Sequence, residues 1–243
     1  MPEPLPESLP ASGREVLRVP ALRALAWYAE AMRLWKRGPA TFAGLAFVTL
    51  VASIAFEPIP ILGFVAANVI APLLATGMLY ASLAADRGEG PRMKHVLAVF
   101  AAPANAQAAV VLAGLVAFAA EAFAAQTLAG ANLLLPTTDA ANLPMDVVVA
   151  IYVAGMAASL PLTFVPFVAL FDGGGLRSAF AASARGFARN VPALALYAGI
   201  SLVLLLLGLA TMGVGLVLVL PWIAAASYAA WKEVFGLDAP AGS

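Results

Sequence analysis

Residues 187–209 read Phe-Ala-Arg-Asn-Val-Pro-Ala-Leu-Ala-Leu-Tyr-Ala-Gly-Ile-Ser-Leu-Val-Leu-Leu-Leu-Leu-Gly-Leu. The segment carries a base, Arg189, near its start and passes through Pro192 into an apolar run without a charged residue. A helix needs about 20 mostly apolar residues to cross a hydrocarbon layer roughly 30 Å thick. The run therefore predicts a membrane-spanning helix that begins beside a positively charged membrane surface.

Positive charge follows the same pattern along the whole chain. The 13 Lys and Arg residues occupy four places outside the apolar stretches, namely 14–37, 87–94, 177–189 and Lys232. Between these places lie paired apolar segments whose far turns carry no base. Because basic residues beside membrane spans stay on the cytoplasmic side, this alternation predicts a multi-pass protein with both termini in the cytoplasm.

The composition excludes a water-soluble domain. The chain is 63% hydrophobic and 11% charged, with a mean hydropathy of +0.95. A soluble domain has roughly 45–50% apolar and about 25% charged residues. The main solvent of this chain is therefore expected to be the lipid bilayer, and a nucleic-acid partner is not expected.

The rare residue types exclude several kinds of site. The chain has no cysteine and a single histidine, His95. Disulfides, thiol catalysis, cysteine metal sites and a bis-histidine haem within the chain are thereby excluded, and no cofactor is expected. The first 18 residues are rich in Pro, Glu and Ser without an apolar core. They are predicted to be a disordered cytosolic tail and not a signal peptide.

The predicted fold is all-α, a polytopic membrane protein with six transmembrane helices in three hairpins. The transmembrane domain is expected over 19–236, followed by a cytosolic tail at 237–243. The first and third hairpins contain short spans joined by tight turns, so either could be re-entrant. The six spans are predicted at about 40–57, 61–85, 104–128, 146–171, 191–209 and 213–234.

An amphipathic segment is predicted before each hairpin, at about 20–37, 91–100 and 175–188. In the first segment, bases and acids recur at three- or four-residue steps opposite an apolar stripe. Such helices lie in the plane of the interface, with their bases toward lipid headgroups. The candidate contacts to anionic phospholipid headgroups on the cytoplasmic face are Arg33, Lys36, Arg37, Arg177, Arg185 and Arg189.

The chain also contains an internal repeat. Leu-Trp-Lys-Arg-Gly-Pro at 34–39 matches Phe-Ala-Arg-Asn-Val-Pro at 187–192, and each run closes an amphipathic segment and opens a span. Three units are predicted, at about 20–86, 91–172 and 175–235. Each unit begins and ends on the same side, so the repeats are parallel, unlike the inverted repeats of many secondary transporters.

These features together resemble a known family. They are the three units, the Lys-Arg-Gly-Pro entry at 36–39, the Pro-to-Tyr-Ala run at 72–81, and the close at 221–235, Pro-Trp-Ile-Ala-Ala-Ala-Ser-Tyr-Ala-Ala-Trp-Lys-Glu-Val-Phe. The chain resembles the BPSS-type family of bacterial inner-membrane proteins over about 20–235. Its layout is similar to the membrane domain attached to some glycerophosphodiester phosphodiesterases. The resemblance implies six helices and an inner-membrane location but no activity, because the chain lacks a phosphodiesterase domain.

Two polar residues are expected at membrane depth. Glu121 lies in the outer third of the third predicted span, where a carboxyl should face a bundle interior or water. It could be a proton or cation site, or it could sit at the wet outer interface if that span ends earlier. Asn68 lies four residues before Pro72, whose ring blocks a bond to the Asn68 carbonyl. Both groups could bind a substrate, or they could only kink the helix and bond to a neighbour.

The sequence leaves three functions open. The leading hypothesis is a non-catalytic scaffold or accessory subunit that packs against other membrane proteins or organises lipid. The alternative is a small-solute transporter or channel with a polar pathway near Glu121 and Asn68. A lipid-handling enzyme built on His95, Asp86 and Glu89 is a third reading.

Overall fold

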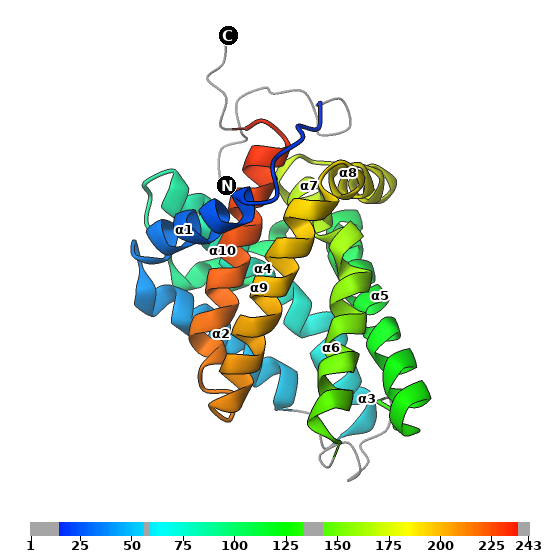
Figure 1. The fold of residues 1–243 in the computed structure, drawn as a ribbon. Coiled ribbons are helices and arrows are strands. Elements are labelled where there is room, and N and C mark those ends of the chain that lie inside the picture. The colour runs from blue at the N-terminus through cyan, green and yellow to red at the C-terminus, as the bar shows by residue number, and fades with distance from the viewer. Residues whose placement is uncertain (1–14, 56–58, 134–142, 238–243) are drawn as a thin grey trace.

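The computed structural model describes residues 15–55, 59–133 and 143–237, and the elements assigned within these ranges are all helical. The predicted all-α class is confirmed for this part of the chain (Figure 1). The elements are α1 Arg23–Trp35, α2 Pro39–Ile54, α3 Pro60–Val65, the π-helix η1 Ala66–Ile70, α4 Ala71–Asp86, the 3-10 helix η2 Met93–Ala101, α5 Ala104–Ala129, α6 Met145–Ser159, the 3-10 turn η4 Leu160–Leu162, α7 Val165–Phe171, α8 Leu176–Arg189, α9 Val191–Ala210 and α10 Leu216–Val234.

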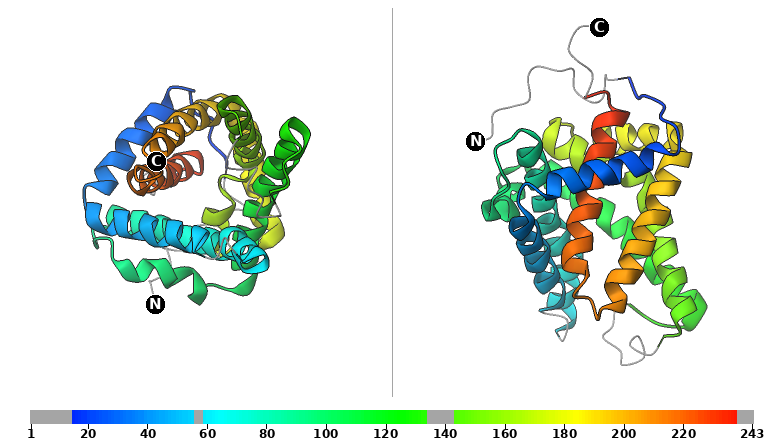
Figure 2. Two further views of the ribbon diagram at one scale, coloured as in Figure 1. Left: turned by 90° about the horizontal axis from the view of Figure 1, so that it is seen from below. Right: turned by 60° about the vertical axis from the view of Figure 1, so that its left-hand side comes forward.

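The long helices surround a common centre. α2 packs on α4, α5 packs on α6, and α9 packs on α10. Seen end-on, these helices form a ring, and α10 lies on its inner side (Figure 2). The shorter segments α1, η2 and α8 lie across the outside of this ring.

Several helices are long and apolar enough to cross a membrane. Four stretches of the described chain meet this test, at Leu62–Asp86, Ala104–Ala129, Met145–Phe171 and Val191–Ala210. A fifth is possible if α1 and α2, which meet at a bend of 104°, count as one broken span. α2 has only 16 residues, or about 24 Å of helix, and α10 is not among the four. The six-span, three-hairpin layout therefore stays a prediction.

α10 occupies the centre because its second half is made of small and aromatic residues. Residues 225–231 are all buried. The small residues among them let α1, α2, α4 and α9 approach closely. Trp231 stacks on Phe167 of α7 with a ring-centroid separation of 5.4 Å. α10, which is not among the four apolar stretches, thus has a largely buried second half.

The predicted amphipathic segments correspond to α1, η2 and α8, with one correction. The second segment is a 3-10 helix over Met93–Ala101 that packs on α4. Leu22 and Leu25 of the first segment are exposed. α1 buries Trp27, Tyr28 and Leu34 against the bundle, where these larger side chains fill the space beside the small residues of α10.

The base-rich segments lie at one end of the molecule. α1, α8 and the start of η2 are at the end where α10 finishes, and the turn between α9 and α10 lies at the opposite end (Figure 1). The charge segregation read from the sequence is therefore also a segregation in space. Which compartment each end faces stays a prediction.

Prolines divide the fourth predicted span into three pieces. Pro161 lies in η4 and Pro166 in the first turn of α7. The break leaves backbone groups that the helix cannot satisfy, and Ser183 of α8 bonds to two of them. Its hydroxyl donates to the Pro161 carbonyl at 2.8 Å and accepts the Phe164 N–H at 3.0 Å. The broken span is thereby joined to α8.

The end of the predicted disordered tail is ordered, which corrects the boundary at residue 18. Val16 is buried, and the Leu17 N–H donates to the Val234 carbonyl at 2.8 Å. The fully buried Asn190 accepts the Val19 N–H at 2.8 Å and donates to the Leu17 carbonyl at 2.9 Å. Residues 1–14 and 238–243 lie outside the described residues, so the rest of both tails stays a prediction.

We predict that Ser183→Ala destabilises the bundle by about 1–3 kcal/mol, because it leaves a buried N–H and a buried carbonyl without their partner. Thermal unfolding in detergent measures the effect. Ser178→Ala is the matched control, since the Ser178 hydroxyl only donates to the Gly175 carbonyl of its own helix. Equal stability of the two variants would contradict this role for Ser183.

Candidate functional site

A central cavity of about 400 Å³ lies inside the ring of helices. Its lining comes from α4, α5, α6, η4, α7, α9 and α10, so residues far apart in the chain meet there. None of the 24 lining residues is charged. A wall of this kind accepts neutral and apolar molecules and excludes ions, because nothing in it replaces the hydration of a charge.

Six hydroxyl groups are the polar part of this lining, and all of them already make hydrogen bonds. Four bond to the carbonyl three residues earlier in their own helix, as Thr76 does to Leu73 at 2.6 Å. The other two bond to a different helix. The six are Thr76, Ser159, Thr163, Tyr197, Ser201 and Ser227.

The hydroxyls that donate to carbonyls keep a lone pair as a free acceptor. These hydroxyls can therefore receive a hydrogen bond from a ligand, but their own protons are occupied. The cavity is thus an apolar space with a few weak acceptors.

α1 supports the α9 wall of the cavity through Tyr28, which does not itself line the cavity. The Tyr28 hydroxyl donates to the Tyr197 carbonyl at 3.0 Å and lies 2.6 Å from Ser201 Oγ. The two tyrosine rings are stacked with centroids 5.7 Å apart. Trp222 of α10 donates its Nε1–H to the Tyr28 carbonyl at 3.0 Å. Burial raises the pKa of Tyr28 far above its usual value, so its hydroxyl stays neutral and keeps these bonds.

The opposite wall depends on an irregularity in the second predicted span. η1, a short π-helix at Ala66–Ile70, ends two residues before Pro72. A π-turn shifts the backbone register, which accommodates a residue that lacks an N–H. Pro72 then faces Gly114 of α5, where an added Cβ would lie 3.5 Å from the proline ring. The proline that the sequence singled out thus shapes the cavity wall.

Asn68 does not line the central cavity. Its side-chain amide donates to the Phe64 carbonyl at 3.1 Å, one helical turn earlier. Phe64 in turn meets Phe118 of α5 edge-to-face, with centroids 5.6 Å apart. The Asn68 side chain therefore satisfies its own helix, one of the two readings left open by the sequence.

Glu121 does not line the central cavity either. It lies at the contact between α5 and α6, where its carboxyl packs directly against Gly155. A Cβ at position 155 would collide with that carboxyl, so the glycine makes room for the acid. Glu121 is half-buried. Since neither Glu121 nor Asn68 lines the cavity, the structure does not bring the two predicted pathway residues together there.

The predicted headgroup contacts divide into two groups. Arg33 makes ion pairs with Glu30 and, at 3.2 Å, with Asp86, and the Arg37 guanidinium donates to the Ala85 carbonyl. These two arginines hold α1 and the following turn to α4. The others are exposed on the base-rich end, namely Lys36, Arg177, Arg185 and Arg189.

Asp86 is the centre of a polar cluster at the same end. Its Oδ2 accepts from Lys232 Nζ at 2.6 Å and from the Tyr228 hydroxyl at 3.0 Å, and its Oδ1 faces Arg33. Nearby, Glu233 accepts from Trp27 Nε1 at 2.7 Å. The cluster therefore joins α1, α4 and α10.

The three residues of the lipid-handling enzyme hypothesis, His95, Asp86 and Glu89, do not lie together around one site. Asp86 is engaged by Lys232, Tyr228 and Arg33, whereas His95 and Glu89 line a separate pocket on α4 and η2. Among residues 15–55, 59–133 and 143–237, no group of three His, Asp or Glu side chains is placed to hold a metal ion.

Comparison with protein-family models, with curated proteins and with solved structures finds no match to this chain. The resemblance to the BPSS-type family therefore stays a prediction, and the function rests on the structure alone.

The amino-acid sequence alone does not reveal the cavity hydroxyls. Serine and threonine in an Ala-rich helix look the same whether they face lipid, a neighbouring helix or a cavity. Tyr28 and Asn190 were missed for a similar reason, since their partners are more than 160 residues away along the chain. Pro72 was one signal for the cavity wall.

We predict that Asp86→Asn lowers stability by about 3 kcal/mol, because the partly buried Lys232 loses its charged partner. Adding Lys232→Met should recover most of this loss, since no unpaired charge is then left. Unfolding midpoints of the two single variants and the double variant form a cycle that measures the coupling. Strictly additive effects would show that the pair is not coupled.

Proposed function

We propose that the protein is a non-catalytic, multi-pass protein of the bacterial inner membrane that binds an apolar molecule, such as a lipid acyl chain, within its helix bundle. The observation that carries this proposal is the uncharged central cavity of about 400 Å³. Pockets of roughly 300–1,000 Å³ with mostly apolar walls are typical ligand sites. A pocket whose wall is mostly apolar and carries no charge favours apolar ligands.

The surroundings supply such a ligand. Large apolar side chains are exposed along the outer surfaces of α5, α6 and α9, as membrane contact requires. α6 packs mainly on α5 and touches α9 only sparsely. Met156 and Leu205, which line the cavity from α6 and α9, are both partly exposed. An acyl chain can therefore enter sideways between these two helices.

The transporter alternative, with a pathway at Glu121 and Asn68, has less support. Asn68 bonds within its own helix and Glu121 packs between α5 and α6, so neither contributes to the wall of the cavity. The cavity hydroxyls offer weak acceptors but no carboxylate for a cation. A neutral apolar solute that moves through the bundle would remain compatible with this geometry.

The proposed orientation places both termini and the base-rich end in the cytoplasm, with six membrane crossings. It follows from the positive-inside rule applied to a bundle whose bases lie at one end. An accessory role beside other membrane subunits is part of the proposal, because the exposed apolar helix faces suit lateral packing as well as lipid contact.

The test compares two Ala→Leu substitutions on α9. Ala198 lines the cavity and is buried, whereas Ala195 is exposed on the same helix. We predict that Ala198→Leu lowers retention of diacylglycerol, a neutral two-chain lipid, about tenfold, or about 1.4 kcal/mol of binding free energy, because the larger side chain fills part of the cavity. Ala195→Leu should retain as much diacylglycerol as the parent protein.

Native mass spectrometry of the detergent-purified protein measures this retention. Thermal unfolding shows that both variants are folded, since overpacking costs about 1–3 kcal/mol. A parent protein that retains no diacylglycerol, or two variants that retain it equally, would contradict the proposed function.

A further inference from the structure

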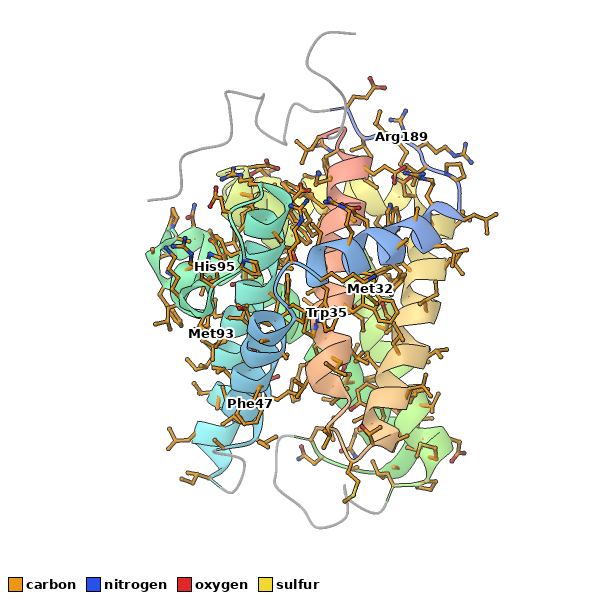
Figure 3. All side chains as sticks on the ribbon, turned by 90° about the vertical axis from the view of Figure 1, so that its left-hand side faces the viewer. Met32, Trp35, Phe47, Met93, His95 and Arg189 are labelled. Carbon is orange, nitrogen blue, oxygen red and sulfur yellow. The ribbon has the colours of Figure 1, made fainter. Side chains whose placement is uncertain are left out.

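A second pocket, of about 360 Å³, lies at the base-rich end between α4 and η2. Arg87, Lys94 and His95 line it together with Tyr80 and one acid, Glu89. Met93 and His95 mark the outward position of η2 beside α4 (Figure 3). This pocket is separate from the central cavity, with which it shares no lining residue.

The bases of this pocket have no ion-pair partner in the described part of the chain. Arg33 and Lys232, at the same end, are both paired with Asp86. Neither Arg87 nor Lys94 makes such a pair within residues 15–55, 59–133 and 143–237. Two cations beside a single carboxylate leave excess positive charge, which favours an anionic ligand.

His95 adds a neutral donor to the two cations. Its Nδ1 accepts the Arg92 N–H at 3.3 Å. Burial and the nearby Lys94 and Arg92 lower the pKa of His95, so the ring is neutral at pH 7. With Nδ1 as the acceptor, the proton is on Nε2, which can donate to a ligand oxygen.

An apolar surface adjoins these polar groups on η2. Leu97 is 61% exposed, and Met93 and Phe100 are 44% and 45% exposed. On a membrane protein, exposed side chains of this kind at the basic end contact the acyl region just below the headgroups. The segment thus presents cationic and apolar groups next to each other.

The packing of η2 holds this arrangement in place. A Cβ at Gly77 of α4 would lie 2.8 Å from the Val96 Cα, so η2 sits directly on the helix. Met93 likewise packs over Gly44 of α2, where a Cβ would lie 2.8 Å from its sulfur. The pocket therefore does not depend on a ligand to form.

We infer that this pocket binds an anionic phospholipid, with its phosphate on Arg87, Lys94 and His95 and an acyl chain along Leu97 and Phe100. Basic pockets on the cytoplasmic side of membrane helices recognise such headgroups. The inference rests on the proposed membrane location but not on the central cavity, and the two sites are tested with different lipids.

The experiment measures binding of phosphatidylglycerol and phosphatidylcholine to the purified full-length protein by native mass spectrometry. We expect the parent protein to bind phosphatidylglycerol at least tenfold more tightly than phosphatidylcholine. The double variant Arg87→Gln/Lys94→Gln should lose about tenfold of this affinity. The charge-preserving variant Arg87→Lys/Lys94→Arg should keep it, and its folding is checked by thermal unfolding.

The matched control is Arg18→Gln/Arg23→Gln, which removes two exposed bases that lie near the end of α10 and do not line this pocket. Equal losses in the two Gln double variants would overturn the inference, because general surface charge would then explain the binding.

A further variant separates a lipid from a soluble anion. Leu97→Ser/Phe100→Ser should weaken phosphatidylglycerol binding about fivefold, since it removes the apolar surface beside the phosphate. No loss in this variant, together with equally tight binding of glycerol phosphate, would overturn the assignment to a lipid. Retention of diacylglycerol should not change in any of these variants, which keeps this test independent of the central cavity.

Discussion

The structure depends on one constraint, which is that backbone polar groups surrounded by apolar side chains and lipid must find partners within the protein. Helices meet this need along most of the chain. Where prolines interrupt a helix, other groups complete the bonding, as Ser183 does for the break at Pro161. Serine and threonine hydroxyls in the helices bond to carbonyls of the preceding turn. The result is a central cavity whose hydroxyl groups are all paired and whose wall therefore suits apolar molecules.

The basic residues form the second part of the structure, because they lie at one end of the bundle. There the charged groups serve two purposes. The cluster around Asp86 joins α1, α4 and α10, while the bases beside η2 remain available for an anion. α1 connects the two parts of the molecule, since it contributes Arg33 to the charged end and places Tyr28 beside the cavity. A lipid held through its headgroup at this end and one held by its chain in the cavity would occupy different depths of the same bundle.

The sequence predicted the helical class and the segregation of the bases, because these follow from composition and local chemistry. It did not predict which face of α1 is buried. Leu22 and Leu25 are more apolar than their neighbours, yet they are exposed. Trp27 and Tyr28 are buried instead, because their shapes fit the packing against α10. Glu121 and Asn68 were predicted to be polar groups at membrane depth. In the structure, Glu121 packs against Gly155, and the Asn68 side chain donates to the Phe64 carbonyl. The sequence did not predict the cavity, because its hydroxyls come from helices distant in sequence.

The proposed topology places the two ends of the bundle on opposite sides of a membrane, and the lack of native cysteines makes this directly measurable. Single cysteines at Met212, 95% exposed in the turn between α9 and α10, and at Glu89, exposed at the base-rich end, are treated with a membrane-impermeant maleimide in spheroplasts. The account predicts that Met212→Cys reacts in sealed spheroplasts and that Glu89→Cys reacts only after they are lysed. Reaction of both cysteines, or of Glu89→Cys alone, in sealed spheroplasts would contradict it.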